Sequence, residues 1–264
     1  MPIHPTAIID PAATIAPSAD IGPNVVIDGP ATIGDHVHII ATSYISGPTT
    51  IEPRCTIHPF TVIGNVPQDL AFEGGESFCT IGEESVIREF VSIHRGTAPG
   101  SSTTIGRRCY LMANSHVAHN CSLGDDVKLA NCASLAGHTT VGSGAFFSAH
   151  CGVHQFCRIG TLAMIGGITK IVQDVPPYFL IDGNPARCRG INTVGLRRAG
   201  FSPQTIAEIK AAHRLLYRSS LARADALHAM REQLFSPQAR ELIRFLEQPT
   251  KRGIVGAANH RPEP

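Results

Sequence analysis

Four histidines in the middle of the chain are spaced so that they could carry acid–base chemistry. His116 and His119 lie three residues apart, and His138 and His154 follow further along the chain. A neutral imidazole is the most common general base near pH 7, so a group of histidines would suit a base with polar neighbours that hold a substrate. The alternative is a row of stacked surface histidines. The fold that positions them decides between the two.

A large apolar residue returns every six positions through most of the chain. The series reads Ile3, Ile9, Ile15, Ile21, Ile27, Ile33, Ile39, Ile45, Ile51, Ile57, Ile63, then Ile81, Ile87, Ile93, then Ile105, Leu111, Val117, Leu123, Leu129, Leu135, Val141, Phe147, Val153, Ile159, Ile165 and Ile171. This period fits neither an α-helix nor an ordinary strand, but it is typical of a parallel β-helix. We therefore predict a left-handed parallel β-helix, an all-β hexapeptide-repeat solenoid, over residues 1–186.

Three hexads form one triangular coil, so positions eighteen apart should lie above one another with a rise of about 4.8 Å. His119, Gly137 and Gln155 then form one column. The polar residues beside this column are His116, His138 and His154. The histidines therefore gather along one edge of about three successive coils, which favours a general base over scattered surface residues.

Two interruptions of the period, at residues 64–80 and 94–104, keep the six-residue phase. The solenoid should therefore resume in register, and the extra residues should bulge outward as loops. Extruded loops of repeat proteins often build the binding face. We expect these two loops to wall the site near the histidines.

The repeat ends near Pro176, Pro177 and Pro185, since proline cannot donate to a β-ladder. Residues 187–250 are predicted as a small α-helical domain, with helices over about 203–220, 223–235 and 237–248, two of them opened by Ser-Pro pairs. The tail, residues 251–264, is predicted to be disordered.

Charge is distributed unevenly between the two parts. Residues 1–186 carry eight Lys and Arg against fifteen Asp and Glu, whereas residues 187–264 carry fourteen against six. A basic terminal domain suggests an acidic partner, although solvated helix faces would produce the same pattern. Neither a nucleic-acid partner nor a membrane span is expected.

The N-terminal residues lack the pattern of a secretory signal, so we expect a cytoplasmic protein. No CxxC pair occurs among the cysteines, which we interpret as reduced, small core residues. These are Cys55, Cys79, Cys109, Cys121, Cys132, Cys151, Cys157 and Cys188.

A zinc site is the competing chemistry. Three histidines on neighbouring coils can bind zinc, as in the gamma-type carbonic anhydrases of the same fold class. Here His116 and His119 are followed by His138, a spacing without a clear pair of ligands across one corner. A non-catalytic scaffold or ice-binding β-helix would need a flat, repetitive Thr face, and the polar positions here are irregular.

Several longer motifs resemble the UDP-N-acetylglucosamine acyltransferase family from about residue 3 to about residue 220. They are IREFVSIHRGT, NSHVAHNC, LAGHTT, GVHQF, IVQDVPPY and GINTVGLRRAGFS. The resemblance implies transfer of a 3-hydroxyacyl chain from acyl carrier protein to the 3-position of UDP-N-acetylglucosamine, in the biosynthesis of lipid A of lipopolysaccharide. It also implies a homotrimer with sites between subunits, and no metal or bound cofactor.

The resemblance also implies a role for individual residues. His119 matches the general base, and Gly137 matches the residue whose N–H steadies the thioester oxyanion. Gly167 matches a position where glycine admits a long acyl chain, although it could also simply permit a tight corner. The implied substrate-binding residues are Gln68, Asp69, His94, His116, His138, His154, Gln155, Asn192 and Arg198.

Three positions depart from the family pattern. Asn120 replaces a common Asp after the base, and a neutral amide can orient an imidazole but stabilises its cation less than a carboxylate. Ala71 replaces a usual Lys, and Val194 replaces a usual acidic residue. These departures leave the acceptor open: the alternative is N-acylation of the 3-amino analogue of the sugar.

Overall fold

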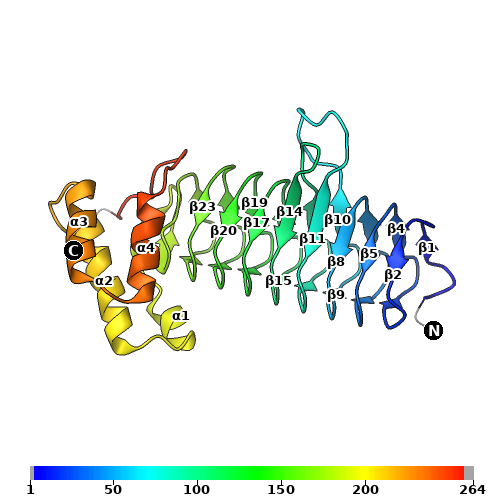
Figure 1. Ribbon diagram of the computed structural model, residues 1–264, viewed down its shortest axis with the longest axis horizontal. Coiled ribbons are helices and arrows are strands. Elements are labelled where there is room, and N and C mark those ends of the chain that lie inside the picture. Colours follow the sequence, from blue (N-terminus) through cyan, green and yellow to red (C-terminus); the bar gives the residue numbers. More distant parts are fainter. Residues whose placement is uncertain (1–2, 259–264) are drawn as a thin grey trace.

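A computed structural model describes residues 3–258, which form a long triangular solenoid with helices at one end (Figure 1). Its three faces are three parallel sheets, and each coil contributes one short strand to each sheet in turn. The fold is the predicted left-handed parallel β-helix. The inward isoleucines are the reason: residues such as Ile57, Ile63 and Ile81 are completely buried and stack in columns between coils.

The strands of the three faces follow in chain order. The first sheet contains β1 (Ile8–Ile9), β4 (Val26–Asp28), β7 (Tyr44–Ser46), β10 (Val62–Asn65), β13 (Ser92–His94), β16 (His116–Val117), β19 (Ser134–Leu135), β22 (Gly152–Val153) and β25 (Lys170–Ile171). The second sheet contains β2 (Thr14–Ile15), β5 (Thr32–Ile33), β8 (Thr49–Ile51), β11 (Phe78–Ile81), β14 (Ser102–Ile105), β17 (Ser122–Leu123), β20 (Thr140–Val141) and β23 (Arg158–Ile159). The third sheet contains β3 (Asp20–Ile21), β6 (His38–Ile39), β9 (Thr56–Ile57), β12 (Val86–Ile87), β15 (Tyr110–Leu111), β18 (Lys128–Leu129), β21 (Phe146–Phe147), β24 (Met164–Ile165), β26 (Phe179–Asp182) and β27 (Arg187–Ile191).

Register between coils confirms the eighteen-residue spacing. Val117 pairs with Leu135, and Leu135 pairs with Val153. Across the first interruption Ile63 pairs with Ile93, which is twelve residues more than the usual eighteen. Across the second, Ile93 pairs with Val117, which is six residues more. The extra residues therefore leave the solenoid as loops without changing its phase. The loops are shorter than predicted, 66–77 and 95–101, because β10, β11, β13 and β14 extend into them.

We call the corners between successive sheets the first–second, second–third and third–first edges. Most corners turn through a residue with left-handed backbone, such as Asn120 and His138, both with φ of 59°. Asn adopts this region more readily than most side chains. Both loops leave at the first–second edge, where β10 joins β11 and β13 joins β14. This edge also holds the corner that follows β16, which carries His119.

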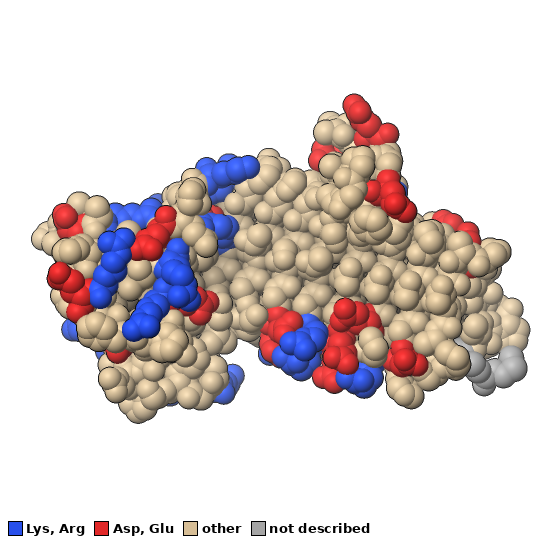
Figure 2. All heavy atoms as spheres, viewed as in Figure 1, with Lys and Arg blue, Asp and Glu red and all other residues tan. Residues whose placement is uncertain are grey.

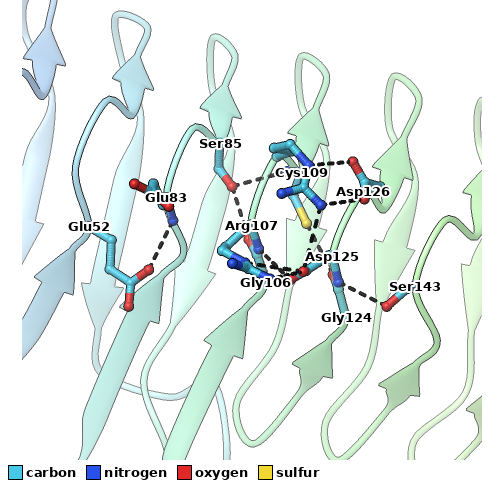
Figure 3. Close-up of polar contacts among 11 residues, drawn as sticks. Glu52, Glu83, Ser85, Gly106, Arg107, Cys109, Gly124, Asp125, Asp126 and Ser143 are labelled. Carbon is cyan, nitrogen blue, oxygen red and sulfur yellow. Dashed lines mark hydrogen bonds and ion pairs between the residues drawn. The ribbon is translucent and has the colours of Figure 1, made fainter.

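Ion pairs line the second–third edge (Figure 3). Arg107 binds Asp125 with a 2.9 Å Nη2–Oδ2 distance, and Arg108 binds Asp126 at 2.8 Å. At the same edge, the Ser85 hydroxyl accepts from Cys109 N–H and donates to the Gly106 carbonyl. These groups satisfy one another from coil to coil, so this edge is structural.

The C-terminal elements close the last coil. β26 pairs parallel with β24, so the third sheet continues past the prolines, and β27 then pairs antiparallel with β26. Four helices follow: α1 (Thr193–Arg198), α2 (Pro203–Tyr217), α3 (Arg223–Gln233) and α4 (Pro237–Glu247). The Ser202 and Ser236 side chains cap α2 and α4 by accepting from backbone N–H groups, as their Ser-Pro pairs predict.

The prediction of a disordered tail from residue 251 is wrong for residues 251–258. Ile254 forms a bridge with Asp174, Ala257 forms one with Cys188, and Val255 is buried. Apolar residues of the tail pack on the last coil. In the sequence they stand among Lys, Arg and Gly residues, so the sequence did not indicate an ordered segment. We call residues 251–258 the C-terminal strap. Residues 259–264 lie outside the described part of the chain.

Candidate active site

A groove of about 490 Å³ runs along the first sheet beside the first–second edge. The β10–β11 loop, which projects from the solenoid, contributes Gln68 to it (Figure 1). Six of the residues predicted from sequence line the groove: Gln68, His116, His119, Gly137, His154 and Gln155. The coil-to-coil columns therefore bring together residues that lie far apart in the sequence.

His119 is almost buried, with 8% of its surface exposed, and its ring is held from both sides. Its Nδ1 lies 2.9 Å from Asn120 Oδ1 and 2.7 Å from Thr97 Oγ1. Its Nε2 lies 3.6 Å from Oδ2 of Asp69, a residue of the β10–β11 loop. One nitrogen is thus occupied by the protein and the other is directed at the space where a substrate would lie. This is the geometry of a general base.

Gly137 lies against the His119 ring and has to be glycine. A Cβ atom there would be 2.5 Å from His119 Cε1 and 2.6 Å from Nε2, closer than any real contact. The next residue, His138, donates its N–H to the His119 carbonyl at 3.0 Å. Within residues 3–258, no acceptor bonds to the Gly137 N–H. A free main-chain donor beside the imidazole can stabilise an oxyanion.

His94 lies beneath the β10–β11 loop, not in the groove. It is 5% exposed, and its Nδ1 accepts from the Gln68 N–H at 3.2 Å. Burial lowers the pKa of His94 to about 4, so it is neutral near pH 7. It therefore anchors the loop that carries Gln68 and Asp69, a position different from the substrate contact that the resemblance implied.

Two further histidines are neutral for the same reason. Burial is the largest cause that lowers the pKa of His116 and of His138. His116 shares a 2.8 Å hydrogen bond with the Ser92 hydroxyl through Nδ1. His138 packs edge-on against His119, with ring centroids 5.3 Å apart, and stacks on Phe156 at 4.6 Å. These contacts fix the walls on either side of His119.

Asn192 and Arg198 lie on a different face of the same chain. They line a second groove of about 860 Å³ on the third sheet, together with Lys128, Met164 and Val194. Asn192 also caps α1, because its Oδ1 accepts from Gly195 N–H at 3.0 Å. The single chain therefore does not bring these two residues to His119.

Gly167 lies at the third–first edge between β24 and β25. A Cβ atom there would meet only Ala149 O, at 3.6 Å, so the backbone does not require glycine. At its neighbour Gly166, a Cβ would lie 2.4 Å from Asp182 Oδ1, so the half-exposed Asp182 side chain would have to move. The tight-corner explanation is therefore not needed at Gly167, which leaves space that a larger side chain would fill.

Known proteins match both parts of the chain. Residues 174–255 match a family model described as UDP N-acetylglucosamine O-acyltransferase, domain 2, and residues 30–65 and 102–137 match bacterial transferase hexapeptide repeats. An acyl-[acyl-carrier-protein]–UDP-N-acetylglucosamine O-acyltransferase from Gloeothece citriformis is 45% identical over 94% of this chain and 90% of its own. The chain belongs to the UDP-N-acetylglucosamine acyltransferase family.

Solved structures of the acyltransferase family share the fold over nearly the whole length. The UDP-N-acetylglucosamine acyltransferase from Bacteroides fragilis superposes with a TM-score of 0.93 at 39% identity, covering 96% of this chain and 99% of its own. The enzyme from Moraxella catarrhalis gives 0.93 at 41% identity, covering 97% and 100%. The same solenoid and helical end thus occur in proteins named for this reaction.

Some residues of this acyltransferase-family site were missed from the sequence. Thr97, beside His119, is the last residue of the IREFVSIHRGT motif but carries no periodic signal. Phe156 is eighteen residues after His138, so the coil spacing could have found it. Lys251 of the C-terminal strap lies over the Phe156 ring at 4.4 Å, and Arg252 Nε donates to Gln155 O at 3.0 Å. Only a folded strap makes these contacts visible.

The described residues contain no cluster of three His, Cys, Asp or Glu side chains arranged to hold a metal ion. The zinc alternative therefore finds no ligand set in residues 3–258. None of the helices in this part of the chain is both long and apolar enough to cross a membrane.

Proposed function

We propose that this chain transfers a 3-hydroxyacyl group from acyl carrier protein to the 3-hydroxyl of UDP-N-acetylglucosamine, in lipid A biosynthesis. Relatives named for this reaction align with nearly all of the chain, among them one from Verminephrobacter eiseniae that is 42% identical over 96% of this chain and 98% of its own. The observation that carries the assignment is His119 Nε2 facing the groove beside Gly137.

The geometry supports a direct transfer between the two substrates. His119 removes the proton of the sugar hydroxyl as its oxygen attacks the thioester carbonyl. The Gly137 N–H stabilises the oxyanion that forms. When the tetrahedral intermediate collapses, the C–S bond breaks and the carrier-protein thiolate takes the proton from the His119 imidazolium. The products are the 3-O-acyl sugar nucleotide and the free thiol.

The groove offers polar contacts for the sugar nucleotide. We assign Gln68 and Asp69 of the β10–β11 loop to binding the glucosamine ring opposite His119. His154 and Gln155 lie one coil beyond Gly137, further along the edge, where the nucleotide would continue. His116 and His138 pack around the base and position it. We assign His94 to holding the loop.

Two grooves on different faces favour a site shared between subunits of a homotrimer. In a ring of three triangular prisms, each chain meets its neighbours with two faces, and those faces share the edge nearest the axis. Here the two grooves that hold predicted site residues lie on the first and third sheets. Asn192 and Arg198 of one chain would then complete the His119 groove of the next, and the Arg198 guanidinium suits a diphosphate.

The third–first edge has the surface that such an axis requires. Phe60 and Phe90 stack there with centroids 5.1 Å apart, and both are more than half exposed in the single chain, as is Ile168. Large exposed apolar side chains on one edge favour burial against a partner. Three copies of this edge would cover one another around the axis.

Complementation between two inactive variants tests the shared site. His119→Ala and Arg198→Ala each remove one half, so each mixed trimer should regain about one of its three sites, which is about a quarter of all sites in a random equal mixture. The measurement is acyl transfer by co-refolded or co-expressed chains, with the trimer mass measured by light scattering. Mixed trimers that stay inactive would show that both residues must come from one chain.

The helical end is the proposed docking surface for acyl carrier protein. Lys and Arg side chains gather over this end (Figure 2). They include Lys210 and Arg214 on α2, Arg223 and Arg231 on α3, and Arg240 and Arg244 on α4. The carrier protein of this family is acidic, so KM for acyl carrier protein should rise with salt concentration. A cytoplasmic location fits the use of both substrates.

A long acyl chain is the expected donor, since Gly167 leaves room at the third–first edge. Gly167→Met should shift the preference toward shorter chains, because its side chain would fill that room. Competition between acyl carrier proteins of different chain length measures the shift. An unchanged preference would refute the role of Gly167 as a length ruler.

The decisive experiment is acyl transfer to UDP-N-acetylglucosamine and to its 3-amino analogue, with mass-spectrometric identification of the product. We expect an ester with the first acceptor. Preferred formation of an amide would place the chain among N-acylating members of the family, to which the Asn120, Ala71 and Val194 departures would then belong. Absence of both products with every acyl donor would refute the proposed function.

A further inference from the structure

The contacts of Asn120 identify which nitrogen of His119 carries the proton. The Thr97 N–H donates to Asn120 Oδ1 at 3.1 Å. A backbone N–H cannot donate to the amide nitrogen of Asn120, so the atom at this position is the carbonyl oxygen. The same oxygen lies 2.9 Å from His119 Nδ1. An oxygen without a proton can only accept, so Nδ1 must be the donor.

The other tautomer would place two lone pairs against each other. If Nε2 carried the proton, the lone pair of His119 Nδ1 would face Asn120 Oδ1 within hydrogen-bond distance, which is repulsive in a nearly buried site. The Thr97 hydroxyl, 2.7 Å from Nδ1, is compatible with either tautomer because it both donates and accepts. The backbone of Asn120 is itself fixed, since its N–H donates to Thr103 Oγ1 at 2.8 Å.

We propose that Thr97 and Asn120 form a neutral clamp that holds His119 as the Nδ1–H tautomer, with Nε2 free to act as the base. This inference rests on the proposed function for its kinetic consequence but not for the tautomer. Thr97 and Asn120 touch the base and not the substrate, so they are positioning residues. Thr97 comes from the β13–β14 loop, which contributes no residue to the lining of the groove, so this loop would act on catalysis through His119.

The clamp carries no charge, so it places no carboxylate beside the Nδ1 side of His119. The groups that face His119 are Asp69 on the Nε2 side and three histidines, His94, His116 and His138. All three histidines have a lowered pKa and are neutral near pH 7. Arg95, in the same loop as Thr97, points away, with its Nη1 donating to the Gly64 carbonyl. No carboxylate among the described residues contacts Nδ1. A protonated ring would therefore be less stabilised on this side than it would be beside a carboxylate.

Asn120→Asp is the sharpest variant, because it adds one charge and little else. Asp, like Asn, tolerates the left-handed backbone at this corner, where φ is 59°. The added carboxylate would stabilise the protonated ring. On lowering the pH, the variant would therefore lose its neutral base at a higher pH than the parent enzyme does. The acidic limb of the kcat/KM profile should move up by about one pH unit or more. A profile that superimposes on that of the parent enzyme would overturn the proposal.

A matched pair of variants tests Thr97. Thr97→Val keeps the shape and the backbone N–H but loses the hydroxyl, whereas Thr97→Ser keeps the hydroxyl. We expect Thr97→Val to lower kcat roughly five-fold with little change in KM for the sugar nucleotide, and Thr97→Ser to stay close to the parent enzyme. A Thr97→Val variant with the kcat of the parent enzyme, or a larger loss in Thr97→Ser than in Thr97→Val, would overturn the role of the Thr97 hydroxyl.

Histidine-selective ¹⁵N NMR of the full chain tests the tautomer without any turnover. The His119 signals are identified by their loss in His119→Ala, and their shifts should report a protonated Nδ1 and an unprotonated Nε2 at neutral pH. The opposite pattern would overturn the clamp even if acyl transfer is observed. Conversely, the expected tautomer in a chain without acyl transfer would refute the proposed function and leave the clamp standing.

Discussion

The first–second and second–third edges of the solenoid have corners of the same backbone conformation, but one edge carries the candidate site and the other carries ion pairs. Asn120 and Asp126 both occupy left-handed positions, with φ of 59° and 60°. At the second–third edge, Arg108 and Asp126 bind each other across one coil step. At the first–second edge, the corresponding positions hold Asn120 and His138, and the imidazole of His119 is left with one nitrogen facing the groove.

The difference shows that the fold repeats the same corner many times. Whether the side chains of a corner bind one another decides whether they are free to contact a substrate. The ion pairs of the second–third edge are half exposed, so they contribute little to stability and leave no group for a substrate. At the first–second edge, His119 is nearly buried, and no acceptor among the described residues bonds to the N–H of the neighbouring Gly137. Variants at the two edges should therefore have very different effects.

The largest effect is expected from His119→Ala, which removes the proposed base. kcat should fall by about three orders of magnitude, since general-base catalysis is commonly worth that much. Steady-state acyl transfer measures the loss, and far-UV circular dichroism checks that the coil is intact. Retention of more than a tenth of the parent activity would disprove the base assignment.

Gly137→Ala should come next, with a loss of about 100-fold or more. The new Cβ would collide with His119 Cε1 and Nε2, and a displacement of a reacting group by about 1 Å can cost that much. Gly190→Ala is the matched control, because a Cβ at Gly190 meets nothing within 4 Å. Similar activity in the two variants would show that the imidazole tolerates the shift.

Acid should loosen the first–second edge through His94. Its pKa is depressed to about 4 in the folded chain, so the unfolded chain binds the additional proton between about pH 6.5 and 4. Stability is therefore lost as the pH falls through this window, by up to roughly 3 kcal/mol from His94. Thermal unfolding at fixed protein concentration should show a shallower pH dependence in His94→Asn, and an identical dependence would argue against this origin.

The smallest effect is expected at the second–third edge. Asp125→Asn removes the carboxylate that binds Arg107, yet the free energy of unfolding should change by less than about 1 kcal/mol, and activity should be unchanged. Chemical denaturation and acyl transfer measure the two. A loss of activity comparable to that of Gly137→Ala would erase the contrast between the edges.

The repeat made the fold and the centre of the site predictable. Stacking at eighteen residues placed Gly137 beside His119, and the structure puts them in contact. Thr97 could not be placed, because it follows β13 in a loop where the period is silent. Asn192 and Arg198 come after the period ends, so the spacing could not show that they lie on another face. The strap was missed because its few apolar residues act only against the last coil.

The exact register of the coils has a consequence for redesign. Moving a side chain eighteen positions along the sequence translates it by one strand spacing, about 4.8 Å, without changing its direction. His119, Gly137 and Gln155 therefore follow one another along the wall of the groove at intervals of one strand spacing. A substrate longer or shorter by one such step could be matched by shifting residues by one coil, with the backbone left as it is.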